Sequence, residues 1–174
     1  MKFTRFLIFL CAVLVFTLQV VSFSQSSVSK SDSSKTKSTA AKSTNNDSEF
    51  KQLIHDYYDA WNTGKPDNAA RFYAKDPGLV FFDLAPLKYT GWDEYKQGVQ
   101  KNLFDNMTEG KLTPSDDLKV TRHGSIAWTT LTFHYALKMK EGKSYDGDGR
   151  HTAIWEKRGG KWLIVHEQLS TPMN

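Results

Sequence analysis

The sequence has few cysteine and proline residues. Its 174 residues include five prolines and a single cysteine, Cys11, which lies inside an N-terminal apolar run. The chain after that run can therefore form no disulfide, thiol nucleophile or thiolate metal site. Leu10 precedes Cys11, where a lipoprotein site requires a small residue, so we do not expect a lipid at this cysteine.

An excess of charge is also missing from the part of the chain that can fold. The formal net charge is +4, yet residues 49–174 carry 17 basic and 17 acidic side chains. The surplus belongs to the N-terminal segments. A basic surface for nucleic acid is therefore not expected, and we predict no nucleic-acid partner.

Motifs for cofactors and metals are absent too. There is no glycine-rich phosphate loop and no G-x-S-x-G motif, and the five histidines lack the spacing of a metal site. Residues 145–149 (YDGDG) resemble a calcium loop but lack its later glutamate, so we interpret them as a hairpin connection. We predict no metal and no cofactor.

Residues 1–24 have the pattern of a secretory signal. Lys2 and Arg5 precede an apolar run, and small residues follow it at Ser22 and Ser24. We expect a cleaved signal, a secreted or periplasmic protein, and no membrane contact after cleavage. The alternative is an uncleaved segment that anchors the chain, since residues 3–23 are long enough to cross a bilayer.

A polar linker and one domain follow. Half of residues 25–48 are Ser or Thr, and the stretch has no aromatic residue, so we expect it to be disordered. Residues 49–174 hold 18 of the aromatic side chains. They are enough for one domain with a core and a pocket.

Helical patterns occupy the first half of this domain. Apolar residues recur with helical spacing over 49–63, Pro66 begins a shorter helix that extends to Ala74, and a third pattern follows Thr90. A short strand is expected over 79–82. Strand patterns dominate later, over 118–122, 126–139, 150–157 and 162–169.

The order of elements indicates an α+β fold. Helices that precede a run of antiparallel strands must cover one face of the sheet. We predict a cone-shaped, curved antiparallel sheet with three helices on its concave face. A pocket is expected between the two layers.

Several segments carry a resemblance to a known family. They are DPGL at 76–79, TAIW at 152–155, GKWLIVH at 160–166 and STP at 170–172. With the element order, they resemble the SnoaL-like branch of the nuclear transport factor 2-like (cystatin-like) superfamily, and the association domain of calcium/calmodulin-dependent kinase II is similar over residues 49–172.

The resemblance implies a homodimer formed by packed sheets and an apolar pocket at the wide end of the cone. In the kinase association domain, pocket arginines are suited to a carboxylate. They align with Phe133, Ala153 and Leu169 here, so an acidic ligand held in that way is not expected.

Similarity to ketosteroid isomerase-like members suggests acid–base residues. Their base follows the first strand, where this chain has Asp83, and their tyrosine on the first helix corresponds to Tyr57 or Tyr58. The second, protonated acid of such enzymes has no counterpart here. A solvated turn carboxylate is the alternative role for Asp83.

The C-terminal hairpin adds further candidate site residues. A two-residue turn at Gly159 and Gly160 places Ala153 opposite His166 and His151 opposite Gln168. One inner face then combines His151, a proton carrier near neutral pH, with Trp155, His166 and Gln168. This register puts Leu169 on the other face, against the family alignment, so a bulge or another turn stays open.

These observations lead to two hypotheses. In the first, an exported dimer binds a small hydrophobic or mixed-polarity molecule without catalysis, with Trp61, Tyr135, Trp155, His166 and Gln168 contacting the ligand. In the second, a cofactor-independent isomerase, cyclase or hydratase uses Asp83, Tyr57 and His151 as catalytic groups. The histidines and aromatics are equally compatible with structural roles, so whether the chain is an enzyme stays open.

Overall fold

The computed structural model describes the backbone of residues 41–173 and the side chains of residues 48–173. The expected signal, residues 1–24, and most of the expected linker lie outside the described residues. Within the described part, no helix is both long and apolar enough to cross a membrane.

The first helix, α1, runs from Ala41 to Trp61. It begins eight residues before the predicted boundary, inside the stretch that we expected to be disordered. Each residue added to an existing helix gains a hydrogen bond without the cost of nucleation. One face is buried, as its spacing predicted: Phe50, Ile54, Tyr57, Tyr58 and Trp61.

Two further helices and two short strands follow α1. The second predicted helix is shorter than expected, because its last residues form a 3-10 turn and Tyr73 is extended. The bounds are α2 Pro66–Ala69, η1 Ala70–Phe72, β1 Val80–Phe82, β2 Tyr89–Thr90, α3 Gly91–Asn102 and η2 Phe104–Asn106.

Five longer strands complete the sheet: β3 Met107–Pro114, β4 Lys119–His123, β5 Ile126–Met139, β6 Ser144–Arg158 and β7 Lys161–Ser170. The strand order is β2-β1-β7-β6-β5-β3, and β4 also pairs with β5. All neighbours are antiparallel except β1 and β7. The α+β prediction is confirmed, with the correction that the sheet is mixed.

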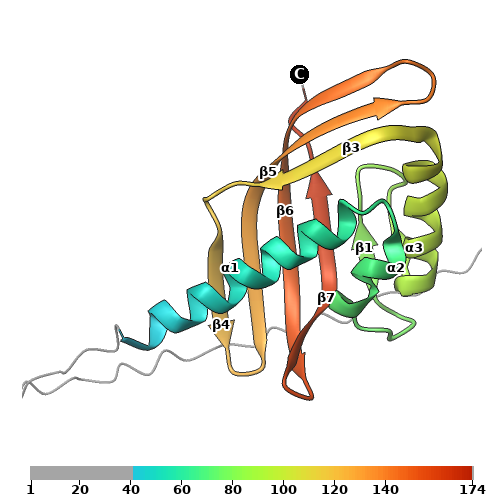
Figure 1. Ribbon diagram of the computed structural model, residues 1–174. Helices are drawn as coiled ribbons and strands as arrows, with labels where there is room; N and C mark the ends of the chain where they lie inside the picture. Colours follow the sequence, from blue (N-terminus) through green and yellow to red (C-terminus); the bar gives the residue numbers. More distant parts are fainter. Residues whose placement is uncertain (1–40, 174) are drawn as a thin grey trace, which may run out of the picture. The chain divides into compact units, whose positions relative to one another are not determined.

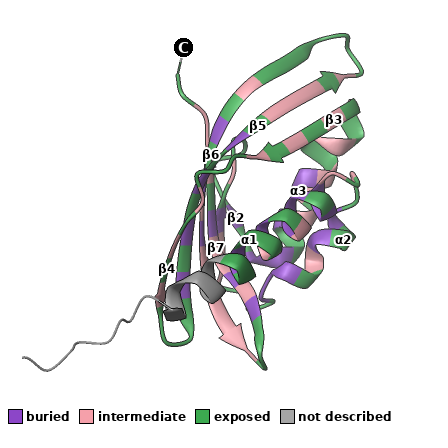
Figure 2. Cartoon of the chain, turned by 60° about the vertical axis from the view of Figure 1, so that its left-hand side comes forward, coloured by how far each residue is buried: buried purple, intermediate pink, exposed green. Residues whose placement is uncertain are grey.

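The three helices lie on one face of the curved sheet (Figure 1). Buried residues gather between the helices and the sheet, while much of the opposite sheet face is partly or fully exposed (Figure 2). The core therefore lies on the concave side, where the sequence predicted a pocket.

Residues 145–149 do not form a turn, so this prediction is wrong. They belong to β6, and Gly149 pairs with Phe133 of β5. A glycine-rich stretch suggests a turn, but a strand also accepts glycine where another group approaches its backbone closely.

Candidate ligand-binding cavity

A cavity of about 210 Å³ lies between the helices and the strands β3, β5 and β7. Its lining is almost entirely apolar: eight aromatic and seven aliphatic side chains, with one amide and one carboxylate. The aromatic residues are Tyr57, Tyr58, Trp61, Tyr89, Tyr95, Phe104, Phe133 and Tyr135. The amide belongs to Asn102 and the carboxylate to Asp83.

Two glycines of β6 make room for the cavity wall that β5 forms. Phe133 and Tyr135 of β5 lie opposite Gly149 and Gly147. A Cβ atom at Gly149 would lie 2.4 Å from the Phe133 ring, and one at Gly147 would lie 2.8 Å from the Tyr135 hydroxyl. Both rings can lie against the strand only because these two side chains are absent.

A third glycine makes room for Tyr89, in the cavity wall next to α3. A Cβ atom at Gly98 of α3 would lie 2.0 Å from the ring of Tyr89. The Tyr89 hydroxyl donates to the carbonyl oxygen of Ala85 at 3.2 Å and accepts from the Asn102 amide at 3.2 Å. Tyr89 thus joins α3 to the loop that carries Asp83.

A buried carboxylate, Glu167 of β7, lies behind the cavity lining. Its Oε2 accepts from the Tyr57 hydroxyl at 2.9 Å, and its Oε1 accepts from the Tyr95 hydroxyl at 2.8 Å. The Tyr73 hydroxyl contacts both oxygens, at 3.1 and 3.0 Å, and accepts from the Trp61 indole N–H at 3.2 Å. The helices α1 and α3 and the segment after η1 therefore meet at this one carboxylate of β7.

His151 of β6 lies on the other side of Glu167. Its Nδ1 is hydrogen-bonded to the Tyr58 hydroxyl at 3.1 Å, and its ring stacks on Tyr57 with centroids 5.2 Å apart. Its Nε2 is 3.4 Å from Glu167 Oε2, without hydrogen-bond geometry. The two side chains are thus in contact without a hydrogen bond between them.

These contacts determine the protonation of the cluster. Burial alone would raise the pKa of Glu167, but His151 and the hydroxyls of Tyr95 and Tyr57 outweigh it, and the pKa is lowered. Burial, and then the negative charge of Glu167, raises the pKa of Tyr57, Tyr73 and Tyr95. The cluster is a carboxylate held by neutral tyrosines.

Asp83 has a different environment. It follows β1, lines the cavity and accepts a hydrogen bond from the Leu84 backbone N–H at 2.7 Å. Burial raises its pKa to about 6, with a smaller contribution from Glu167, while the Leu84 N–H, Tyr95 and His151 lower it. The two carboxylates are therefore shifted in opposite directions.

Six of the eight predicted site residues divide into three groups. Asp83, Tyr57, Trp61 and Tyr135 all line the cavity. His151 lies behind the wall, in contact with Tyr57. Trp155 lies farther down the core, where its indole N–H donates to Thr129 and its ring packs on Phe50. It does not line the cavity.

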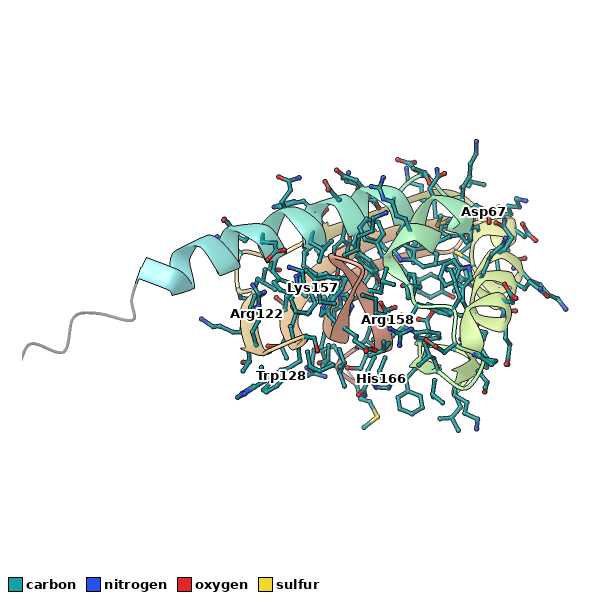
Figure 3. All side chains as sticks on the ribbon, turned by 90° about the horizontal axis from the view of Figure 1, so that it is seen from below. Asp67, Arg122, Trp128, Lys157, Arg158 and His166 are labelled. Atoms are coloured by element: carbon teal, nitrogen blue, oxygen red, sulfur yellow. The ribbon has the colours of Figure 1, made fainter. Side chains whose placement is uncertain are left out.

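The predicted position of His166 and Gln168 on the inner face is wrong. Ala153 pairs with Glu167 and His151 with Leu169, because a register shift follows the pair of Ile154 and His166. His166 instead contacts the Val80 carbonyl oxygen through Nδ1 at 2.7 Å. Figure 3 shows its side chain, with that of Trp128, on the side of the sheet away from α1.

Glu167 is the main residue that the sequence interpretation missed. The same register shift brings it inward, together with Leu169, which lines the cavity as the family alignment indicated. The alignment of Leu169 was the available signal, because residues two apart on a strand share a face.

Comparison with known proteins agrees with the fold. Residues 50–174 match the model of the SnoaL-like domain family, to which the chain therefore belongs. No curated protein matches it in sequence. Among the residues that the structure describes, no group of three His, Cys, Asp or Glu side chains is placed to hold a metal.

Several solved structures share the architecture. A nuclear transport factor 2-like superfamily protein from Salmonella enterica has 17% identity and a TM-score of 0.69 over 76% of this chain and 94% of its own. The association domain of Caenorhabditis elegans CaMKII has 16% identity and a TM-score of 0.58, over 74% and 97%. A Novosphingobium aromaticivorans protein, provisionally described as a scytalone dehydratase, has 16% and 0.64, over 76% and 89%.

Proposed function

We propose that this SnoaL-like domain is exported, forms a homodimer and binds a small organic molecule in its apolar cavity without catalysing a reaction. One observation carries the binding role. The hydroxyls of Tyr57 and Tyr95 are directed to Glu167, which is not part of the cavity lining. Their rings thus form apolar walls, and their donors are occupied elsewhere.

Catalysis by acid and base needs at least two polar groups directed at one reacting atom. The Tyr58 hydroxyl is also occupied, by His151 behind the wall. Among the described residues that form the lining, Asp83 is the only one with a charged side chain. A cavity of this kind is suited to enclosing an apolar molecule, because aromatic walls contribute large buried areas.

Titration with the neutral fluorescent probe N-phenyl-1-naphthylamine tests the binding role. Leu169→Trp would place a larger side chain in the cavity and reduce its volume, whereas Leu163→Trp, on the same strand, changes a residue outside the lining. We expect the first variant to weaken binding at least tenfold and the second to leave it unchanged. Equal affinities for both variants would refute binding at this site. Native mass spectrometry of protein from its own host would identify a co-purified molecule.

A second candidate function rests on Asp83, whose pKa of about 6 suits a general base near neutral pH. It would serve the isomerase, cyclase or hydratase chemistry considered above. Deuterium exchange next to the carbonyl of 2-tetralone is a direct test. Exchange that the protein accelerates, and that Asp83→Asn abolishes, would favour the enzyme over the binding protein.

The outer sheet face supports the proposed dimer. Register places Trp128 beside Ile154 and His166, and the Phe82 ring packs on His166 at 5.3 Å. Trp128 is 40% exposed and Phe82 36%. Light scattering should give a dimer mass at micromolar concentration and a monomer for Trp128→Lys, with Tyr145→Lys as control. A monomeric wild type would contradict the dimer.

A further inference from the structure

The lining of the cavity carries negative charge. Asp83 contributes a carboxylate, and the lining residues that the structure describes include no lysine, arginine or histidine. Glu167 adds a second negative charge directly behind Tyr57 and Tyr95. The basic side chain of His151 lies at Glu167 rather than in the cavity.

This arrangement discriminates between ligands by charge. A carboxylate or phosphate in the cavity would face Asp83 without any counter-charge, which is unfavourable in an apolar environment. A neutral hydrocarbon would leave Asp83 desolvated and without a charged partner. A cation would pair with Asp83 and offset its desolvation.

The aromatic walls of the cavity also favour a cationic ligand. Eight aromatic side chains surround the cavity, and their ring faces attract cations. Tyr57, Tyr58 and Tyr95 direct their hydroxyls to Glu167 or His151, so their rings, rather than their hydroxyls, are available to a ligand. Aromatic walls around one carboxylate can enclose an apolar body and bind an ammonium group.

We infer that the ligand is an apolar, ring-containing amine whose protonated nitrogen pairs with the Asp83 carboxylate inside the aromatic cavity. This inference rests on the proposed binding function and specifies its ligand class. Asp83 supplies the charge, while the aromatic rings supply the apolar contact.

Three compounds with one ring system test the inference: 2-(1-naphthyl)ethylamine, 2-(1-naphthyl)ethanol and 1-naphthaleneacetic acid. Isothermal titration at pH 7.5 should show the amine binding at least tenfold more tightly than the alcohol, and the acid most weakly. In Asp83→Asn the advantage of the amine over the alcohol should disappear, whereas Asp83→Glu should keep part of it. Asp59→Asn removes an exposed acid of α1 and should behave as wild type.

Acidification of the wild-type protein gives a second measurement. The groups that influence Asp83 are the Leu84 N–H, Glu167, Tyr95 and His151. With a pKa of about 6, Asp83 is mostly protonated at pH 5, so amine affinity should fall about tenfold between pH 7.5 and pH 5. Binding of the alcohol should change much less.

The outcomes separate the two proposals. If the alcohol binds the wild type as tightly as the amine, or if Asp83→Asn keeps the preference for the amine, the inference is wrong and the binding function stands. If none of the naphthyl compounds binds and Leu169→Trp leaves probe affinity unchanged, the binding function itself fails.

Discussion

Replacement of Glu167 should destabilise the fold strongly. Three tyrosine hydroxyls, from Tyr57, Tyr73 and Tyr95, donate to this fully buried carboxylate. Each buried donor that is left without its acceptor typically costs about 1–3 kcal/mol. Glu167→Ala also leaves a space in the core, so we expect a loss of about 4–5 kcal/mol in the free energy of unfolding.

Glu167→Gln isolates the contribution of the charge, because the shape is kept. One acceptor oxygen becomes an N–H donor that faces hydroxyls which are themselves donors, so we expect a loss of about 3 kcal/mol. Urea unfolding at pH 7, followed by tryptophan fluorescence, measures it. Gln168→Ala, at the exposed neighbouring position, should stay within about 0.5 kcal/mol of wild type.

The pH dependence of this loss has a definite sign. The pKa of Glu167 is lowered from its ordinary 4.5, so the folded state stabilises the ionised form. That stability is present above pH 4.5 and is lost as the pH falls through the folded-state pKa. The difference between wild type and Glu167→Gln should therefore shrink on acidification. A difference that grows at low pH, or no difference at pH 7, would refute the assigned role.

Two further predictions concern the cavity. In Gly149→Ala the new methyl group must push the Phe133 ring toward the cavity. We therefore expect a loss of about 1–3 kcal/mol in the free energy of unfolding and at least tenfold weaker probe binding. The control Gly78→Ala, with open space around the new methyl group, should change neither quantity. Asp83→Asn should stabilise the protein at pH 7.5: the folded-state pKa is raised from 3.8 to about 6, so stability falls as the pH rises through this window. The upper limit of the gain is about 3 kcal/mol. Thermal unfolding at pH 7.5 and pH 3.5 tests it, and a lower Tm of Asp83→Asn at pH 7.5 would contradict it.

The longer elements were predictable because their signals are local. Apolar spacing identified α1 and α3, and two glycines with positive φ, Gly159 and Gly160, form the turn between β6 and β7. By contrast, β3 was missed. Its Thr108, Glu109 and Lys111 are exposed, so the strand lacks the continuous alternation that a sequence pattern would reveal.

The site was less predictable than the fold, because one register shift decides which residues face inward. Between Ile154 and Trp155 the pairing with β7 moves by one residue. Such a shift exchanges the two faces of a strand, so it replaced His166 and Gln168 with Glu167 and Leu169 on the inner side. No residue near the shift marks it locally; only the alignment of Leu169 with a pocket position indicated it.

The two carboxylates explain how one aromatic interior can be both rigid and selective. Glu167 is ionised and already bonded to hydroxyls from α1, α3 and the segment after η1, so it joins those elements to β7. Asp83 has fewer donors and a raised pKa, so it gains most from a partner that arrives with a charge. Exchange of the two roles would fail: a ligand cannot reach Glu167 without displacing tyrosines, and Asp83 contacts too few elements to hold the walls. The position of each acid thus separates structural support from ligand recognition.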